Sequence, residues 1–388
     1  MSAASQQVKK KRIGSIDGLK GLAAVWILMF HYLLAFAPYG HVGFGSGIAK
    51  ADAYDYYMSY YPYSCLVATP FALYLFFALI AYIPTLRLMK KGDNAFIAKQ
   101  AVTRYFRLVP ATLTGALLGY AAFYYFGSYH AALAESLRPI TGAGWLSTLY
   151  YPDLNLTEAV KDGLYESLVF GHEESNSVLW CMQVVLHGSY LTYAVLLMFG
   201  KLRNRWLIYL VLFGVSFMLP QATAFLAGIA AADFSQQVEP GKHNRLMVAT
   251  LMLLGTVCGF FPHVLLPSWL TKHTLLGMAA FFFLLGFARS GLMVTLLDNC
   301  FFRHLGKISF GILLVQFPVM LSFSAWVYLQ LVGAGYGYPA AAALSFAASL
   351  PVVWVLSVLF YYAVEIPGGK LCQLVFKPFS AEHQRPQL

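Results

Sequence analysis

Charged residues are scarce in this sequence. Asp, Glu, Lys and Arg make up only 11% of its 388 residues, and no soluble domain, internal repeat or low-complexity stretch is recognisable between the apolar runs. Soluble globular domains carry about 25% charged residues, so the shortage excludes the soluble class. The formal net charge of +10 does not indicate nucleic acid, because the basic residues are confined to particular loops. We therefore expect a membrane protein with no nucleic-acid partner.

Cysteine is also rare and shows no pattern. The five cysteines form no CxxC pair and have no histidine partners at metal-ligand spacing, which excludes a disulfide framework and a structural zinc site. His172 precedes Glu173 and Glu174 but lacks the second histidine of a zinc-binding HExxH motif. The sequence therefore predicts no metal site and no bound cofactor.

Apolar residues are abundant instead. Hydrophobic side chains account for 59% of the chain and the mean hydropathy is +0.64. Successive apolar runs are long enough to cross a bilayer as helices of about 20 residues. The pattern predicts an all-α fold, a polytopic membrane helix bundle. We expect about ten transmembrane helices, at approximately 17–38, 66–88, 101–127, 176–199, 204–219, 220–235, 246–265, 273–290, 305–332 and 339–365.

The loops between these runs alternate in charge. Basic residues cluster at the N-terminus, in 89–100 and in alternate loops thereafter, whereas acidic residues concentrate in the long segments 39–65 and 128–175. Cytoplasmic loops carry an excess of Lys and Arg, so we expect both termini in the cytoplasm and the two long segments outside. Segment 128–175 is too long for a simple connector and is expected to cover the outer mouth of the bundle. The implied location is the cytoplasmic (plasma) membrane, with the lipid bilayer as a partner.

One stretch, residues 12–38, combines an apolar run with two ionisable side chains. Lys20 and His31 are eleven positions apart. At about 100° per residue they lie on nearly the same helix face, with the histidine about three turns deeper. Most lysines at such positions are headgroup anchors, and a histidine there can be a packing residue. Ionisable groups at depth are costly, however, and mark functional sites. We interpret the pair as the two ends of one binding site.

Two arginines begin the third predicted helix. Arg104 and Arg107 are three residues apart, which places both guanidiniums on one helix face at the cytoplasmic border. Planar guanidiniums are suited to bidentate capture of phosphates. An isolated pair of this kind is ordinarily positive-inside charge. Here it follows a basic loop and precedes Pro110, and with Lys20 it would form a cationic rim for a phosphorylated substrate.

Five segments in this order resemble the transmembrane acyltransferase-3 family. The first is SIDGLKGLAA followed by His31, since a basic residue, ten further residues and a histidine form the family signature. The others are Arg104-x-x-Arg107-x-x-Pro110, the segment 176–183 around Trp180 with Gly188-Ser189 after it, LGKISF at 305–310 continuing to Phe317-Pro318, and VEIP at 364–367. The resemblance thus runs from residue 12 to about residue 367.

The resemblance implies a ten-helix acyltransferase domain over residues 1–370 and a short cytoplasmic tail at 371–388. It implies a membrane O-acyltransferase for acyl groups other than aminoacyl. The donor substrate would be cytoplasmic acyl-coenzyme A, in particular acetyl-coenzyme A. The acceptor would be a hydroxyl of a glycan or another polyol, as in polysaccharide O-acetylation.

The resemblance also implies roles for individual residues. Lys20, Arg104 and Arg107 would bind the donor phosphates. His31 would be catalytic, either as the general base for the incoming hydroxyl or as a transient carrier of the acyl group. The arginines cannot accept that proton, because they are permanently charged. A structural role or a place in the acceptor site is expected for four further residues, Trp180, His187, Gln316 and Glu365.

The chain departs from the family pattern at three places. Val185 stands where members usually carry Glu, Gln316 where they carry His, and Ile80-Ala81 where they carry Ser-Gly. Because the donor-side residues are retained, we expect an altered acceptor site, in which His187 could compensate. The alternative is a catalytically degenerate member, or a transporter-like carrier of an acylated or lipid-linked molecule. The inverted repeats and broken helix pairs typical of secondary transporters are not seen in the sequence.

Overall fold

The computed structural model describes residues 3–36, 69–92, 94–141, 154–216, 219–236, 244–261 and 271–377, together with residues 146 and 149. Within these ranges every regular element is an α, 3-10 or π helix, and there is no strand. The all-α fold class is therefore confirmed. Helices satisfy their own backbone hydrogen bonds, which is why an apolar chain adopts them in lipid.

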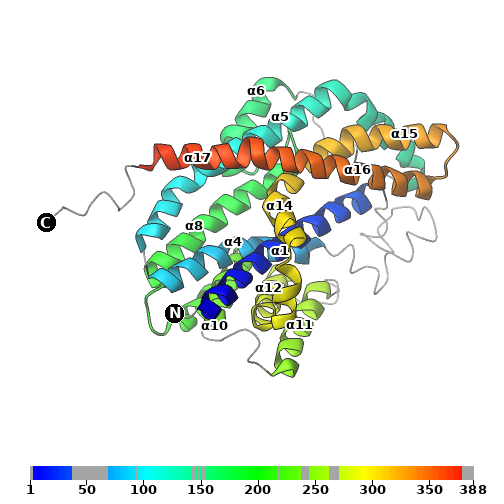
Figure 1. Cartoon of the computed structure of the whole chain (residues 1–388). Helices are drawn as coiled ribbons and strands as arrows, with labels where there is room; N and C mark the ends of the chain where they lie inside the picture. The colour runs from blue at the N-terminus through cyan, green and yellow to red at the C-terminus, as the bar shows by residue number, and fades with distance from the viewer. Residues whose placement is uncertain are drawn as a thin grey trace.

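The first turns of α1 and the last turns of α17 lie on the same side of the molecule, the left of Figure 1. The first half of the chain forms α1 (Ala3–Phe36), α4 (Thr69–Lys91), α5 (Asn94–Thr141), α6 (Leu156–Lys161), η3 (Asp162–Glu166), α7 (Ser167–Val169), η4 (Ser177–Trp180) and α8 (Cys181–Phe199). The second half forms α9 (Arg205–Val215), α10 (Ala222–Gln236), α11 (Arg245–Phe260), α12 (Lys272–Arg289), α13 (Gly291–Leu297), α14 (Cys300–Val319), η7 (Met320–Ser324), α15 (Ala325–Gly333), α16 (Tyr338–Phe360), η8 (Tyr361–Glu365) and α17 (Ile366–Val375).

Each of the ten ranges predicted as a transmembrane helix falls on a helix of the structure. Within the described residues, 6 helices are long and apolar enough to cross a membrane, and the pair α12 and α13, bent by 89°, makes up to 7. The helices α9 and α11 are apolar but shorter. The chain is thus a multi-pass membrane protein, and the count of ten spans stays a prediction.

Helix α1 crosses α14 at glycines. A Cβ added to Gly21 would lie 2.6 Å from the backbone nitrogen of Gly306, so the two backbones approach too closely for a larger residue at this point. Small residues permit such approaches between membrane helices. Gly21 belongs to the SIDGLKG segment and Gly306 to LGKIS. Two motifs far apart in sequence therefore form one helix crossing, which fixes α1 and its functional side chains against α14.

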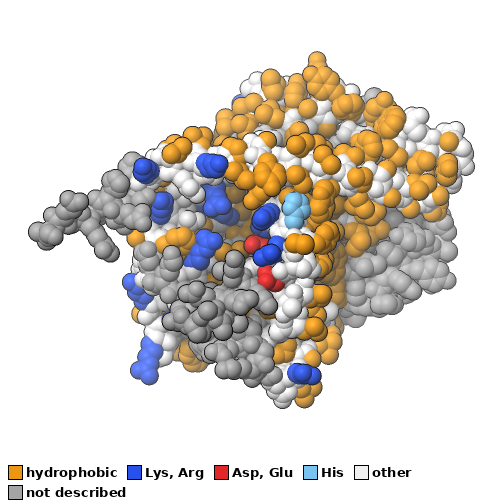
Figure 2. Space-filling model, in the orientation of Figure 1, with side chains coloured by type: hydrophobic (Ala, Val, Ile, Leu, Met, Phe, Trp, Pro, Cys, Tyr) orange, Lys and Arg blue, Asp and Glu red, His pale blue; other side chains and the backbone are white. Residues whose placement is uncertain are grey.

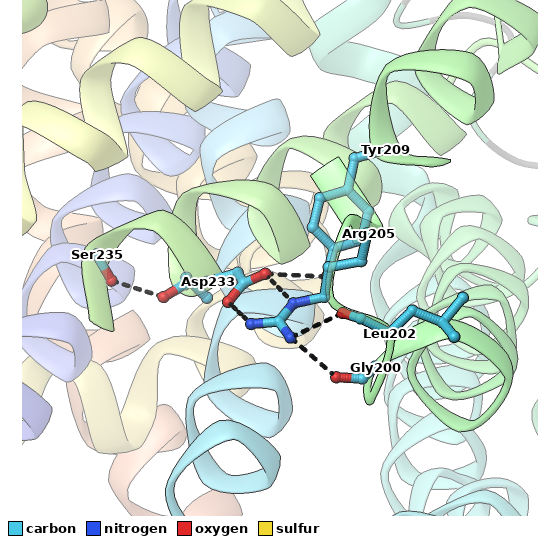
Figure 3. Close-up of polar contacts among 7 residues, drawn as sticks. Gly200, Leu202, Arg205, Tyr209, Asp233 and Ser235 are labelled. Carbon is cyan, nitrogen blue, oxygen red and sulfur yellow. Dashed lines mark hydrogen bonds and ion pairs between the residues drawn. The ribbon is translucent and has the colours of Figure 1, made fainter. Parts of the chain in front are cut away.

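An ion pair ties α9 to α10 (Figure 3). Arg205 bonds the carboxylate of Asp233 through Nε and through Nη2, and Tyr209 donates to the same carboxylate at 3.2 Å. The remaining nitrogen, Nη1, donates to the carbonyls of Gly200 and Leu202, both at 3.3 Å. Asp233 is buried, so the guanidinium compensates a charge that would be costly to leave unpaired in an apolar interior.

The predicted outer segment 128–175 is largely helical where the structure describes it. Helix α5 extends through its first part, and α6, η3 and α7 occupy its second. Just beyond it, the Asn176 side chain donates to the carbonyl of Gly115 at 3.0 Å and to that of Leu314 at 2.9 Å. One buried amide thus joins the end of this segment to α5 and to α14.

Candidate functional site

The three cationic residues predicted to act together line a single cavity. Its volume is about 300 Å³. Lys20 reaches it from α1, and Arg104 and Arg107 reach it from α5. We call it the inner cavity. The spacing of Arg104 and Arg107 along α5 is enough to place them together. Lys20 reaches the same cavity only because separate helices pack together in the folded bundle.

Basic side chains also gather on the surface near these helices. In Figure 2 they lie over the left and the centre of the visible face, while its upper part is mostly hydrophobic. The left side is also where α1 begins and α17 ends (Figure 1). This distribution agrees with the charge alternation read from the loops.

Arg104 is held in place by α8. Its Nε donates to the hydroxyl of Ser189 at 3.0 Å, and that hydroxyl donates to the carbonyl of Val185 at 2.6 Å. No protein acceptor within the described residues bonds the two terminal nitrogens of the guanidinium. They remain available to a ligand in the inner cavity, in the planar geometry that suits a phosphate.

Two further charged residues line the inner cavity. Arg87, near the end of α4, adds a fourth cation, and its guanidinium carbon lies 5.8 Å from the ring centroid of Phe96. Glu365 was expected to be structural or part of an acceptor site. It lines the inner cavity with these cations, and its Oε1 is buried without a hydrogen-bond partner among the described residues. Four cations thus face one carboxylate in the lining, and this excess favours a polyanion.

His31 lines a second cavity, of about 260 Å³, which we call the outer cavity. Trp180, from η4, also lines it, so a predicted acceptor-site residue and the predicted catalytic residue lie together. Lys20 and His31 are separated by about 16 Å along α1. They line two neighbouring cavities, and their interpretation as the two ends of one binding site stays a prediction.

The imidazole of His31 is oriented by Gln316 of α14. His31 Nδ1 lies 3.1 Å from Gln316 Oε1, while Gln316 Nε2 donates to the carbonyl of Leu313 at 3.1 Å. Because the amide nitrogen bonds Leu313, the amide oxygen faces the histidine. A carboxamide oxygen only accepts hydrogen bonds, so Nδ1 carries the proton and Nε2 keeps a free lone pair. The ring also contacts Phe317, with ring centroids 4.8 Å apart.

Several polar residues of the outer cavity belong to none of the sequence motifs. The hydroxyl of Tyr74 lies 2.5 Å from Nδ1 of His273 and donates to the carbonyl of Pro220 at 3.1 Å. Lys272 and Gln221 complete the polar lining on this side. These residues come from α4 and from the starts of α10 and α12, so only the tertiary fold brings them to His31.

The departures from the family pattern lie in two different places. Val185 and Ile80 line the inner cavity, while Gln316 contacts His31. Of the three departures only Gln316 is therefore at the histidine, and the altered acceptor site expected from Val185 and Gln316 stays a prediction. His187 is exposed on α8 and lines neither cavity, so its position gives no support to a compensating role.

A separate polar cluster lies on the segment that follows α6. Asp162, Glu166 and His172 each place one possible ligand atom within 4.8 Å of the others. Asp162 accepts hydrogen bonds from the backbone nitrogen and the hydroxyl of Ser175, at 3.0 and 2.8 Å. Burial raises the pKa of the Asp162 carboxyl, and the bonds from Ser175 lower it in part. His172 Nδ1 lies 3.7 Å from Glu166. We interpret the cluster as structural, because these contacts hold the segment together.

The chain has been compared with known families and proteins. A family model described as an acyltransferase domain (acyltransferase 3) matches residues 13–358, which is most of the chain. No curated protein and no solved structure matches it. The matched range includes His31 and the four cations of the inner cavity but ends before Glu365. Helix α17 is continuous across residue 370, and the domain boundary expected there stays a prediction.

Proposed function

Because this chain belongs to the acyltransferase-3 family, we propose that it transfers an acyl group from acyl-coenzyme A to a hydroxyl group. Membership of the family implies acyltransferase activity and therefore an acyl donor. Our proposal adds acetyl-coenzyme A as the donor and a glycan or another polyol as the acceptor. It also adds the cytoplasmic membrane as the location.

The inner cavity supports the donor assignment. Coenzyme A carries a diphosphate and a ribose phosphate, which match the excess of cations contributed by Lys20, Arg87, Arg104 and Arg107. The reactive thioester lies at the far end of the flexible pantetheine arm. The phosphates can therefore stay bound at the cations while the thioester extends along α1 towards His31.

The outer cavity supports the chemistry. The free lone pair on Nε2 of His31 takes the proton of the acceptor hydroxyl, and the hydroxyl oxygen attacks the thioester carbonyl carbon. The carbon–sulfur bond breaks, the new ester forms, and the proton passes from the imidazolium to the departing thiolate. Gln316 keeps the tautomer required for this transfer, although it cannot stabilise the imidazolium as a carboxylate would.

The observation that carries the proposal is that one helix, α1, supplies both the oriented imidazole of His31 and a cation of the inner cavity, Lys20. The direct test is purified protein in nanodiscs with acetyl-coenzyme A, following thiol release with and without hydroxyl acceptors and identifying products by mass spectrometry. Acceptor-dependent thiol release is the expected result. If the protein neither cleaves the thioester nor acylates any glycan or polyol tested, the carrier alternative replaces the enzyme.

A change at Gln316 is expected to lower kcat and to leave donor binding unchanged. Gln316→Leu removes the bond that holds His31 in its tautomer, and one such hydrogen bond is worth about 0.5–1.5 kcal/mol, so the loss should be up to about tenfold. Gln316→Glu should move the acidic limb of the pH–rate profile to higher pH, because a carboxylate favours the imidazolium. Steady-state kinetics across pH would check both changes, and a Leu variant with unaltered kcat would contradict the positioning role.

Topology gives a second prediction. Phe170→Cys and Ala98→Cys, each in a chain whose native cysteines are replaced by Ser, place single exposed thiols in the two oppositely charged regions. Under the positive-inside rule an impermeant thiol reagent should label position 170 in intact cells and position 98 only after permeabilisation. Equal labelling of both positions in intact cells would contradict the proposed orientation.

A further inference from the structure

Among the described residues, only Phe76 lines both the inner and the outer cavity. It lies on α4, where Leu73 precedes it in the outer cavity and Ile80 follows it in the inner cavity. The facing helix α14 shows the same order, with Leu313 in the outer cavity and Phe310 in the inner one. The two cavities are therefore neighbours along α4 and α14, and on α14 their lining residues are about one helical turn apart.

We propose that Phe76 is the partition between the donor and acceptor cavities, and that the acyl group must pass its ring to reach His31. The residue is well placed for this, since only 3% of it is exposed and it lines both cavities. This role rests on the proposed function, because a partition matters to catalysis only if the donor and acceptor enter separately.

The partition would protect the thioester from water. Water that reached the donor would attack the carbonyl carbon, break the carbon–sulfur bond and leave a carboxylic acid and the coenzyme A thiol. Acyl-coenzyme A bound at the cations of the inner cavity would then be hydrolysed even when no acceptor is bound. A phenyl ring between the cavities excludes this water until the acyl group itself moves past it.

The neighbouring Phe77 offers a matched control. It is equally buried, and its ring stacks on Phe225 with centroids 5.7 Å apart. It lines the outer cavity but not the inner one. Phe77→Ala therefore removes the same atoms as Phe76→Ala from the adjacent position of the same helix, without joining the cavities. Phe76→Leu serves as a milder variant, because removing a buried ring also destabilises a protein.

The native Cys181 provides a readout that needs no catalysis. It is a free cysteine that lines the outer cavity. In full-length protein with the other cysteines replaced by Ser, an impermeant methanethiosulfonate reagent is applied to intact cells or to inverted membrane vesicles. A second reporter, Leu73→Cys with Cys181→Ser, lines the same cavity.

Both reporters should be labelled from outside in every variant. Labelling from the inner face should rise about tenfold or more in Phe76→Ala, rise less in Phe76→Leu, and stay at the native rate in Phe77→Ala. Hydrolysis of acetyl-coenzyme A without acceptor should rise in the same order. Equal inner-face labelling of the native protein and Phe76→Ala, equal effects of the two Ala variants, or no labelling of either reporter from outside would each overturn the partition. If labelling changes as expected but no variant cleaves the thioester, the partition stands and the proposed function fails.

Discussion

His31→Gln is expected to lower kcat by about 10²–10⁴-fold, the usual contribution of a general base. Glutamine has a similar size and can hydrogen-bond Gln316, but it cannot accept the acceptor's proton near neutral pH. The phosphate-binding cations line the other cavity, so donor affinity should be unchanged. Calorimetry with a non-hydrolysable acyl-coenzyme A analogue would measure binding, and acetyl transfer under saturating donor would measure kcat.

His187→Gln is the matched control, because it makes the same substitution at an exposed histidine that lines neither cavity. It should retain native kcat and native donor affinity. Full turnover by His31→Gln would remove this histidine from the mechanism. Loss of donor binding in His31→Gln, with binding intact in Arg104→Ala, would mean that the roles of the two cavities are reversed.

The helices were predictable from the sequence because lipid leaves the backbone few alternatives. An apolar run of about 20 residues must satisfy its own hydrogen bonds, so hydropathy located every long helix. The ends were less predictable. Helix α5 runs on to Thr141, well past the predicted end at 127, because Leu133 and Leu137 of the segment after the apolar run are buried in the hydrophobic core. The described apolar helices α9 and α11 are too short to fix the number of spans from length alone.

The site was predictable only where helical spacing alone brings its residues together. Arg104 and Arg107 share one helix, and both line the inner cavity as the spacing indicates. The pairing of His31 with Gln316 joins positions 285 residues apart, and no local pattern encodes it. The place of Arg87 in the inner cavity was not predictable, because a basic loop orients the membrane helices whether or not a residue beside it also faces a cavity.

Arg104→Ala is expected to weaken donor affinity on the order of tenfold to a hundredfold, since a charge-assisted hydrogen bond contributes about 1.5–3 kcal/mol. The phosphates do not change during the reaction, so the ground state and the transition state should be weakened alike. KM for the donor should therefore rise with little change in kcat. Arg104→Lys should recover only part of the affinity, because an ammonium cannot make the paired contacts of a guanidinium.

Arg138→Ala provides the control for this change on the same helix. Its side chain is 64% exposed and forms an ion pair with Glu135 at the far end of α5. A pair this exposed contributes little to stability, so donor affinity, kcat and the amount of folded protein should stay native. Raised salt should weaken donor binding to the native protein more than to Arg104→Ala, because one screened cation is already absent. An Arg104→Ala variant with native KM but a hundredfold lower kcat would instead place this arginine at the reacting thioester and contradict a role in phosphate binding alone.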